Sequence, residues 1–258
     1  PELIRNVRDA LDVRGFVGHG AHPDVLEAAG AKDADMIIAV TFHDEVNMIA
    51  CQVAHSLFEV PTKIARIRAQ AYLQPHAMDM FSRDNMPIDV IISPELEVGE
   101  MVLRRIALPG AADAVGFADD RIIMVALECL EDCPVVDTPL SQLSELFPDL
   151  LATVVGISRG GRLIVASSQD QLAVGDLAYV IASKQQVRRT MGLFGHDEEK
   201  AARIVIAGAG NIGLHVARAI ETGDTPAKVK IIEAGRERAV AAADSLRRTI
   251  VLHGSALD

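Results

Sequence analysis

Short apolar runs alternate with longer amphipathic stretches along residues 1–94. The apolar runs predict strands at residues 15–18, 36–40 and 62–67. The amphipathic stretches predict helices at residues 2–11, 23–29, 44–58 and 69–84. This regular alternation of strand and helix is typical of a parallel, doubly wound α/β sheet.

The pattern changes after residue 94. Strands are predicted at residues 113–116, 122–129, 152–158 and 178–182, with a single helix at 139–147. The sequence SRGGRL, with its paired glycines, predicts a hairpin turn between two strands. These features predict a small α+β domain, and the polar stretch 195–202 is predicted to be the linker that follows it.

A glycine motif lies near the end of the chain, within ARIVIAGAGNIGLHVARAIE (residues 202–221). The apolar run 203–207 predicts a buried strand, residues 214–221 continue as a helix, and 228–232 reads as a second strand. Gly208 permits the tight turn, Gly210 lets the backbone approach a pyrophosphate, and Gly213 lets the helix pack closely on its strand. This context predicts a dinucleotide-binding turn with phosphates at the start of the helix.

Glu233 ends the second strand of this motif, 20 residues after Gly213. A carboxylate at that position accepts hydrogen bonds from both ribose hydroxyls, which favours an unphosphorylated ribose such as that of NAD or ATP. The alternative is a strand–helix–strand unit that binds no ligand.

The two ends of the chain resemble one another. Near the start lie Val17, His19, Gly20 and Asp24, and these align with Val251, His253, Gly254 and Asp258. The sequence therefore predicts the later part of one nucleotide-binding unit at the start and the early part of a second unit at the end. The first residue, Pro1, agrees with a cut chain. We also expect the two parts to complement one another, with residues 204–206 in parallel beside a strand of residues 1–90, within one chain or between two chains.

Composition and charge narrow the function classes. The formal net charge of −11 argues against a nucleic-acid binder, which normally carries a basic face. No apolar run approaches the roughly 18–20 residues of a membrane span, and no secretory leader is visible. The three cysteines, Cys51, Cys129 and Cys133, suit a cytoplasmic protein and are expected to be ordinary thiols. His19, His22 and His253 are expected to be solvated or capping residues rather than metal ligands.

These motifs resemble, in order and over essentially the whole chain, the Trk-type potassium-uptake regulatory subunits of the RCK/KTN family. The resemblance rests on GHGAHPDVLEAAGAKDADMIIAVTFHDEVNMIACQVA (18–54), ARIR (65–68), LPGA (108–111), VGDLAYVIAS (174–183), GAGNIG (208–213) and KIIEAGRERA (230–239). It implies Rossmann-like, doubly wound parallel sheet elements and a small α+β RCK C-terminal domain. The implied boundaries are 1–94 for the later part of a first Rossmann domain, 95–195 for the C-terminal domain, and 196–258 for the early part of a second Rossmann domain.

The resemblance also implies a function and a set of binding residues. Such subunits bind NAD, NADH or adenine nucleotides (ATP or ADP) and gate a potassium-translocating membrane protein from its cytoplasmic face. A homo-oligomer, peripheral to the inner membrane and without nucleic acid, is implied. In the first unit the nucleotide contacts fall on Thr41, Phe42 and Arg66, and in the second on Gly208, Ala209, Gly210, Asn211, Ile212, Gly213 and Glu233.

Two of these positions carry alternatives, and a third question concerns the adenine end, which His253 and Gly254 approach in the family. Phe42 stands where the family commonly has small polar residues, so its backbone is the expected contact. Arg66 suits a phosphate or carboxylate partner, and the alternative is a surface ion pair. The family often has Asp after the glycine equivalent to Gly254, where this chain has Ser255, so an adenine contact there is open.

Two classes of function remain. A regulatory module needs only different nucleotide affinities in two conformations. An NAD-dependent oxidoreductase needs a proton-transfer residue beside the nicotinamide. The sequence offers no Tyr-x-x-x-Lys pair, Tyr72 and Tyr179 sit in patterns typical of packing, and no histidine lies between Ile91 and Phe194. The regulatory module, which is not an enzyme, is therefore favoured.

Overall fold

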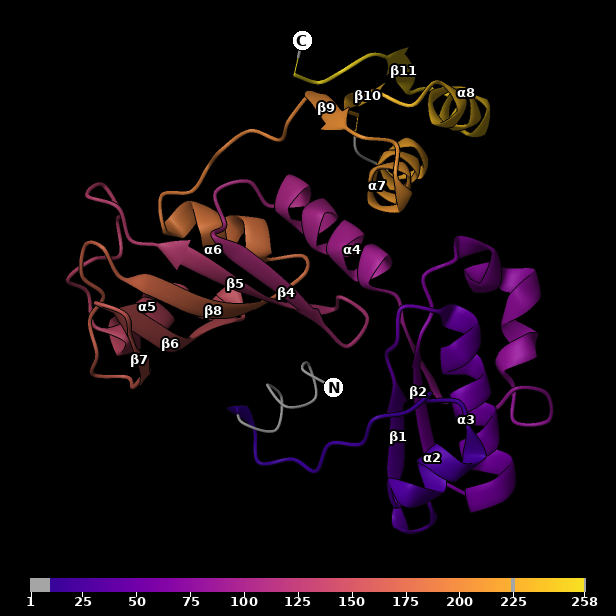
Figure 1. Cartoon of the computed structure of the whole chain (residues 1–258). Coiled ribbons are helices and arrows are strands. Elements are labelled where there is room, and N and C mark those ends of the chain that lie inside the picture. The colour runs from indigo at the N-terminus through magenta and orange to yellow at the C-terminus, as the bar shows by residue number, and fades with distance from the viewer. Residues whose placement is uncertain (1–9, 224–225, 258) are drawn as a thin grey trace. The chain divides into compact units, whose positions relative to one another are not determined.

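The computed structural model describes residues 10–223 and 226–257 in two compact units, Pro1–Glu97 and Val98–Asp258. Figure 1 shows their elements by colour and label, and each unit is considered by itself.

The first unit is built around a parallel three-stranded sheet. Its strands are β1 (Met36–Ala39), β2 (Thr62–Arg66) and β3 (Val90–Ile92), in the order β1-β2-β3. In register, Ile38 pairs with Ile64 and Ala65 pairs with Ile91. The helices are α2 (Pro23–Ala28), α3 (Asp44–Phe58) and three short 3-10 helices, Ala31–Asp33, Gln70–Leu73 and Pro75–Phe81. The parallel, Rossmann-like character predicted for this part of the chain is confirmed.

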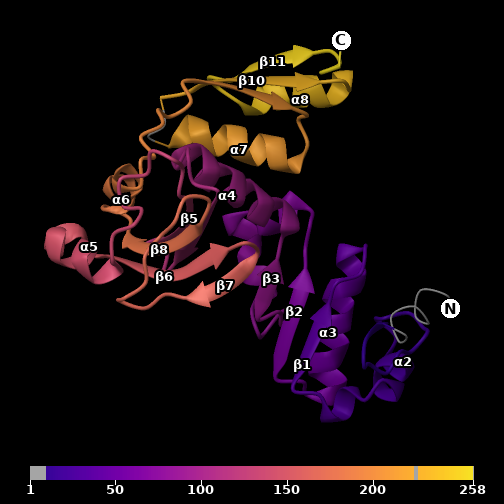
Figure 2. The same ribbon diagram turned by 90° about the vertical axis from the view of Figure 1, so that its left-hand side faces the viewer.

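Helix α3 covers one face of this sheet, as both ribbon views show (Figures 1 and 2). Ala39, Ala65 and Ile67 from the sheet side pack with Cys51 in the buried cluster. On β1 the side chains that alternate with this buried set, Met36 and Ile38, are exposed. A strand that buries alternate residues in this way has one face against a helix and the other open.

Two predicted elements of the first unit are wrong. Residues 15–18 form no strand. A strand there needs a neighbour, and the three strands described among residues 10–97 pair only with one another. Residues 69–84 form 3-10 turns instead of one α-helix, because Pro75 forces Gln74 into an extended conformation with ψ of 146°. The helix predicted at 2–11 lies almost wholly outside the described residues, and the short strand β3 was not predicted.

The second unit contains an antiparallel five-stranded sheet in the order β4-β5-β8-β6-β7. Its strands are β4 (Asp113–Phe117), β5 (Ile122–Glu128), β6 (Ala152–Arg159), β7 (Arg162–Val165) and β8 (Leu177–Ser183). The predicted hairpin joins β6 to β7 through Gly160 and Gly161, both with positive φ. The helices are α5 (Leu140–Leu146), the 3-10 helix Pro148–Leu150, and α6 (Val187–Leu193), and α4 (Pro94–Ala107) leads into the unit. Helices α4 and α6 were not predicted.

One buried cluster lies between this sheet and its helices, with Leu127, Val180 and Met191 at its centre. The predicted linker 195–202 contains no helix or strand. It is nevertheless anchored, because His196 is buried and its Nε2 lies 2.9 Å from the Glu128 carbonyl oxygen.

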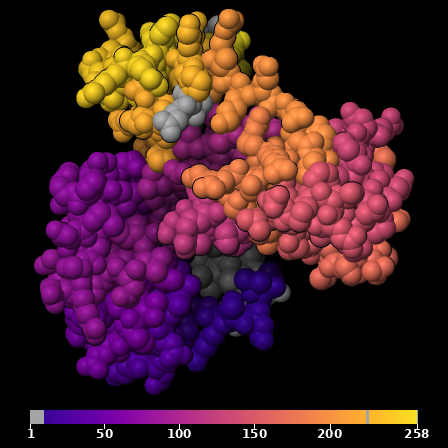
Figure 3. Space-filling view, turned by 180° about the vertical axis from the view of Figure 1, so that it is seen from behind, coloured from indigo at the N-terminus to yellow at the C-terminus, as the bar shows by residue number. Residues whose placement is uncertain are grey.

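The last part of the chain forms a second parallel sheet, in the order β11-β10-β9. Its strands are β9 (Arg203–Ala207), β10 (Lys228–Glu233) and β11 (Ile250–His253), and its helices are α7 (Asn211–Thr222) and α8 (Arg236–Ser245). In the space-filling view this segment is orange to yellow (Figure 3). Strand β9 pairs with β10 alone among the described strands, so the composite sheet expected with residues 1–90 of the same chain is wrong.

Candidate nucleotide-binding site

The three glycines of the turn after β9 have distinct roles in the structure. Gly208 has a φ of +101°, a conformation that residues with a side chain rarely adopt. A Cβ atom on Gly213 would lie 2.2 Å from the Gly208 carbonyl oxygen, so this glycine permits the close contact between turn and helix. A Cβ atom on Gly210 would meet no atom within 4 Å. Open space therefore lies beside Gly210, where the motif expects the pyrophosphate.

The first turn of α7 follows this open space directly. Gly210 is the N-cap residue of the helix and offers no side-chain cap. The side chains of Asn211 and Ile212 are exposed at the first two helical positions. The N–H groups of a first helical turn have no partner within the helix, and together with the helix dipole they favour an anion.

Glu233, at the end of β10, is buried beside the turn. Its Oε2 accepts a hydrogen bond of 2.7 Å from the Ala209 N–H. Its Oε1 accepts from the Gly235 N–H at 2.8 Å and from Nη2 and Nε of Arg238 at 2.7 and 3.0 Å. The amide of Ala209 first, and then the amide of Gly235 and the Arg238 side chain, lower the pKa of Glu233 to about 2. The carboxylate is therefore ionised at neutral pH, and the Ala209 N–H is the one donor to Oε2 among the described residues.

A second carboxylate supports the same unit from the far end of α7. Glu221 accepts backbone hydrogen bonds from Arg247, Arg248 and Thr249 at 3.1, 2.7 and 2.6 Å, which holds the segment leading into β11. Burial alone would raise the pKa of Glu221, but these hydrogen bonds outweigh it and lower the pKa to about 2.

Acid should therefore destabilise this unit. Because the folded-state pKa values of Glu221 and Glu233 lie below the ordinary value of 4.5, their contribution to stability is present above about pH 4.5 and is lost as the pH falls towards 2. Urea unfolding measured from pH 6 to pH 2.5 should show that the free energy of unfolding falls steeply with pH. In Glu221→Gln the free energy of unfolding should depend less on pH. An unchanged slope in the variant would show that the carboxylate does not control acid stability.

In the first unit, the predicted residues Thr41 and Arg66 are held together by Asn47, which is fully buried on α3. Its Oδ1 accepts from the Thr41 N–H at 2.8 Å and from the Thr41 hydroxyl at 2.7 Å. Its Nδ2 donates to the carbonyl oxygens of Thr41 and Arg66 at 3.1 and 2.9 Å. One side chain therefore fixes the backbone at the carboxyl ends of β1 and β2, the edge where ligands of such sheets bind.

Phe42 and Arg66 extend this edge outward. The Phe42 side chain is 81% exposed, and the Arg66 guanidinium lies 5.5 Å from the centre of its ring. Nη2 of Arg66 donates to the Thr41 carbonyl oxygen at 2.7 Å, and Nε is buried without a partner. No carboxylate among residues 10–223 and 226–257 forms an ion pair with Arg66, so the surface ion pair considered as an alternative is not seen.

The ten predicted binding residues thus fall into two groups, one in each unit, and within each group the structure brings them together. Asn47 and Arg238 complete the groups and were not predicted. Asn47 could have been noticed from the sequence. It is a polar residue on the side of α3 that otherwise buries apolar residues such as Met48 and Cys51. Arg238 follows Glu233 by five residues, but nothing in the sequence indicates that its side chain turns back to the carboxylate.

The cysteines and histidines show no comparable arrangement. Burial raises the pKa of Cys129 to about 12, and Cys133 beside it acts in the same direction, so this thiol is protonated. The rings of His19 and His22 stack with centroids 4.5 Å apart. In the part of the chain that the structure describes, no group of three or more His, Cys, Asp or Glu residues is placed to hold a metal ion. The described helices are also too short or too polar to cross a membrane.

Comparison with known proteins agrees with this organisation. Residues 1–94 match the TrkA-N domain and residues 124–195 match the TrkA-C domain. Over 257 residues the chain is 60% identical to the Trk system potassium uptake protein TrkA of Azorhizobium caulinodans, covering all of this chain and 56% of the relative. It is 41% identical over 255 residues to the protein of the same name from Halomonas elongata, covering 99% of this chain and 55% of the relative. The chain therefore spans about half the length of these curated relatives.

Solved structures show the same fold. The RCK domain of GsuK matches with a TM-score of 0.59 and 18% identity, covering 100% of this chain and 52% of that one. The GsuK channel bound to NAD matches with a TM-score of 0.60 and 16% identity, covering 100% of this chain and 43% of that one. With its TrkA-N and TrkA-C domains and the similarity of the whole of this chain to about half of each Trk potassium uptake protein, the chain belongs to the TrkA family of RCK-type proteins.

Proposed function

We propose that this chain is part of a cytoplasmic regulatory subunit that binds NAD, NADH or an adenine nucleotide and gates a membrane potassium transporter or channel. One observation carries the binding part of the proposal. The glycine turn leaves open space at Gly210, directly before the uncapped start of α7, with the ionised Glu233 beside it. This combination provides amide groups for phosphates and a carboxylate for ribose hydroxyls.

The partner and location are proposed from the relatives. Proteins 60% and 41% identical to this chain are named Trk system potassium uptake proteins. A regulatory role then requires a membrane potassium-translocating subunit, contacted at the cytoplasmic face by a peripheral homo-oligomer. Residues 196–258 would open a second nucleotide-binding unit after the C-terminal domain of the first, with boundaries near residues 94 and 195.

An NAD-dependent oxidoreductase is the alternative. Such an enzyme needs a proton donor, and the chain has two tyrosines. Tyr72 packs on the buried cluster of the first unit, and Tyr179 is half-buried within β8. Regulation needs no such donor, only nucleotide-dependent populations of two states. NADH oxidation assayed with a panel of small carbonyl substrates distinguishes the two functions, since turnover would favour the enzyme.

The proposed function is tested by calorimetric titration of the chain with NAD, NADH, ATP and ADP. We expect saturable binding of at least one, and a matching change in potassium uptake when the corresponding residues are altered in a complete transport system. Absence of binding by all four nucleotides, for a chain shown to be folded by circular dichroism, would contradict the proposal.

The part of the proposed site around Glu233 should disfavour a nucleotide whose ribose carries a 2′-phosphate. The ionised Glu233 repels a phosphate in the same small site, while Arg238, which is 69% exposed and bonded to Glu233, partly offsets that charge. We expect NAD to bind about tenfold tighter than NADP, roughly 1.4 kcal/mol. Arg238→Ala should widen this preference and Glu233→Gln should narrow it, measured side by side at one salt concentration. Equal affinities in the unaltered chain would exclude this role for Glu233.

A further inference from the structure

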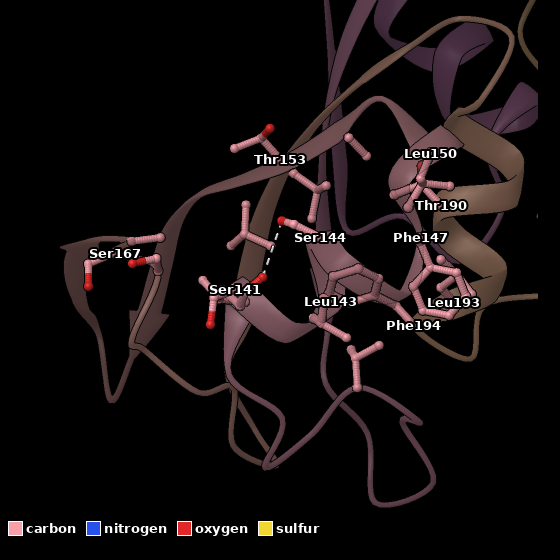
Figure 4. Close-up of a pocket in the computed structure, with 17 residues that line it drawn as sticks. Ser141, Leu143, Ser144, Phe147, Leu150, Thr153, Ser167, Thr190, Leu193 and Phe194 are labelled. Carbon is pink, nitrogen blue, oxygen red and sulfur yellow. Dashed lines mark hydrogen bonds between the residues drawn. The ribbon is translucent and has the colours of Figure 1, made fainter.

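Positive charge is concentrated in the last part of the second unit. Residues 203–258 contain eight Lys or Arg residues and six Asp or Glu residues, whereas residues 1–202 contain 17 and 30. The cavity in the α+β domain, by contrast, is lined by apolar and hydroxyl side chains, with Phe147, Leu193 and Phe194 at one end (Figure 4). A local basic region in a chain with a net charge of −11 is typical of a surface that meets an anionic partner.

Four cations lie at the amino ends of the strands of the second parallel sheet, the end opposite the glycine turn. Lys228, the first residue of β10, pairs in register with Arg203, the first residue of β9. Arg247 and Arg248 lie just before β11. Because the three strands run parallel, their amino ends meet at one edge of the sheet. All four residues are exposed there.

Lys230 extends this region onto the open face of the sheet. Lys228 and Lys230 alternate along β10 with buried residues such as Ile231, which packs in the cluster with α7 and α8. Alternate side chains of a strand point to opposite faces, so the two lysines point away from these helices. Val205 and Ile250 pair with Lys230 in register and are 63% and 54% exposed. Cations at the edge are therefore followed by a row that mixes a cation with apolar side chains.

Together these five cations form the basic edge: Arg203, Lys228, Lys230, Arg247 and Arg248. Within residues 10–223 and 226–257, no carboxylate forms an ion pair with any of them. Glu221 lies near this edge, but its carboxylate accepts hydrogen bonds from the backbone N–H groups of residues 247–249. The charge of the basic edge is therefore available to a partner outside the chain.

We propose that the basic edge binds the anionic headgroups of a lipid bilayer. Its guanidinium and ammonium groups would pair with lipid phosphates, while Val205 and Ile250 would meet the apolar layer beneath the headgroups. A nucleic acid presents phosphates without such a layer, so the neighbouring apolar side chains favour a bilayer. This inference rests on the proposed function, because it assigns the part of the chain that contacts the membrane in the proposed peripheral location.

Flotation of the whole chain with lipid vesicles tests this contact. Each Lys or Arg near an anionic surface strengthens binding about fivefold, so five of them predict half-maximal binding at roughly millimolar lipid. We expect binding to phosphatidylcholine vesicles that contain about 30% phosphatidylglycerol, and no binding to phosphatidylcholine alone. Raising the salt from about 50 mM to about 300 mM should release the chain, because added ions screen exposed charges.

Two pairs of substitutions with equal changes in net charge locate the surface. Arg203→Gln with Lys228→Gln should weaken binding to the anionic vesicles about 25-fold. Arg218→Gln with Arg236→Gln is the matched control, because these exposed residues lie on α7 and α8, which pack on the opposite face of the sheet. The control pair should change vesicle binding by no more than about twofold, since charges beyond a Debye length are screened.

Nucleotide titration of the same samples separates the lipid contact from nucleotide binding. A chain that binds nucleotide but floats equally with neutral and anionic vesicles keeps the proposed nucleotide function and overturns the lipid contact. A chain that floats only with anionic vesicles but binds no nucleotide supports the lipid contact and contradicts the nucleotide function. Equal weakening by the two pairs of substitutions would show that net charge, and not the basic edge, controls binding. Displacement of the vesicles by duplex DNA at equal phosphate concentration would show a general polyanion surface and overturn the lipid assignment.

Discussion

Gly210→Val should lower nucleotide affinity at least about fivefold while the fold survives. The backbone at Gly210, with φ of −74° and ψ of −177°, is extended and accepts any residue, and a Cβ there meets no protein atom within 4 Å. The side chain would instead occupy the space beside the first turn of α7. Loss of charge-assisted hydrogen bonds to a pyrophosphate costs about 1–2 kcal/mol. The loss of a favourable N-cap residue should cost at most about 1 kcal/mol of stability.

Gly213→Ala is the matched contrast, because it should damage the fold itself. Its Cβ would lie 2.2 Å from the Gly208 carbonyl oxygen and 3.2 Å from Cγ2 of Ile206. The first obstacle is backbone and cannot rotate away, so we expect a loss of about 3 kcal/mol, at the upper end of the range for overpacking.

Calorimetry for affinity and urea unfolding for stability separate the two effects. The assignment of the turn as a phosphate site fails if Gly210→Val binds nucleotide as tightly as the unaltered chain. The geometric argument fails if Gly213→Ala is as stable as Gly210→Val.

The contrast between these glycines also shows which features can be predicted from the sequence alone. The turn is predictable from sequence because Gly208 and Gly213 answer local backbone requirements and Gly210 follows the spacing of the phosphate motif, and the strand predicted at residues 203–207 has the observed ends. Helix α4 was equally predictable in principle. It begins with Pro94, has Glu95 and Glu97 in its first turn, and carries Arg104 and Arg105 in its last, which are standard signals for the two ends of a helix.

Other features depend on partners that lie far along the sequence. Residues 15–18 have the composition of a strand but no neighbouring strand among residues 10–97, so local propensity alone does not decide their conformation. At the site, the ionised state of Glu233 depends on the Ala209 amide 24 residues earlier and on the rotamer of Arg238. The role of Asn47 depends on Arg66, 19 residues away on the next strand. Spacing rules do not encode such contacts.

Asn47→Leu should destabilise the first unit by about 3 kcal/mol. The substitution preserves approximate volume but removes all four hydrogen bonds that join α3 to the ends of β1 and β2. The Thr41 carbonyl oxygen keeps its bond from Arg66 Nη2, so the main cost comes from the Thr41 N–H and the Arg66 carbonyl oxygen. Each buried polar group left without a partner costs roughly 1–3 kcal/mol.

A graded series isolates this effect. Thr41→Val removes the hydroxyl bond to Asn47 Oδ1 and the longer bonds of the same hydroxyl with the His43 backbone, at 3.2 and 3.3 Å, and should cost about 1 kcal/mol. Ser56→Ala, at an exposed position of the same helix, should change stability by no more than about 0.5 kcal/mol. Urea unfolding monitored in the first unit should therefore give Ser56→Ala the highest free energy of unfolding of the three variants. Thr41→Val should be lower, and Asn47→Leu much lower still. If Asn47→Leu unfolds within about 1 kcal/mol of the unaltered chain, Asn47 does not hold the ends of β1 and β2. In that case Thr41 and Arg66 are fixed by the strand pairing of β1 with β2 alone.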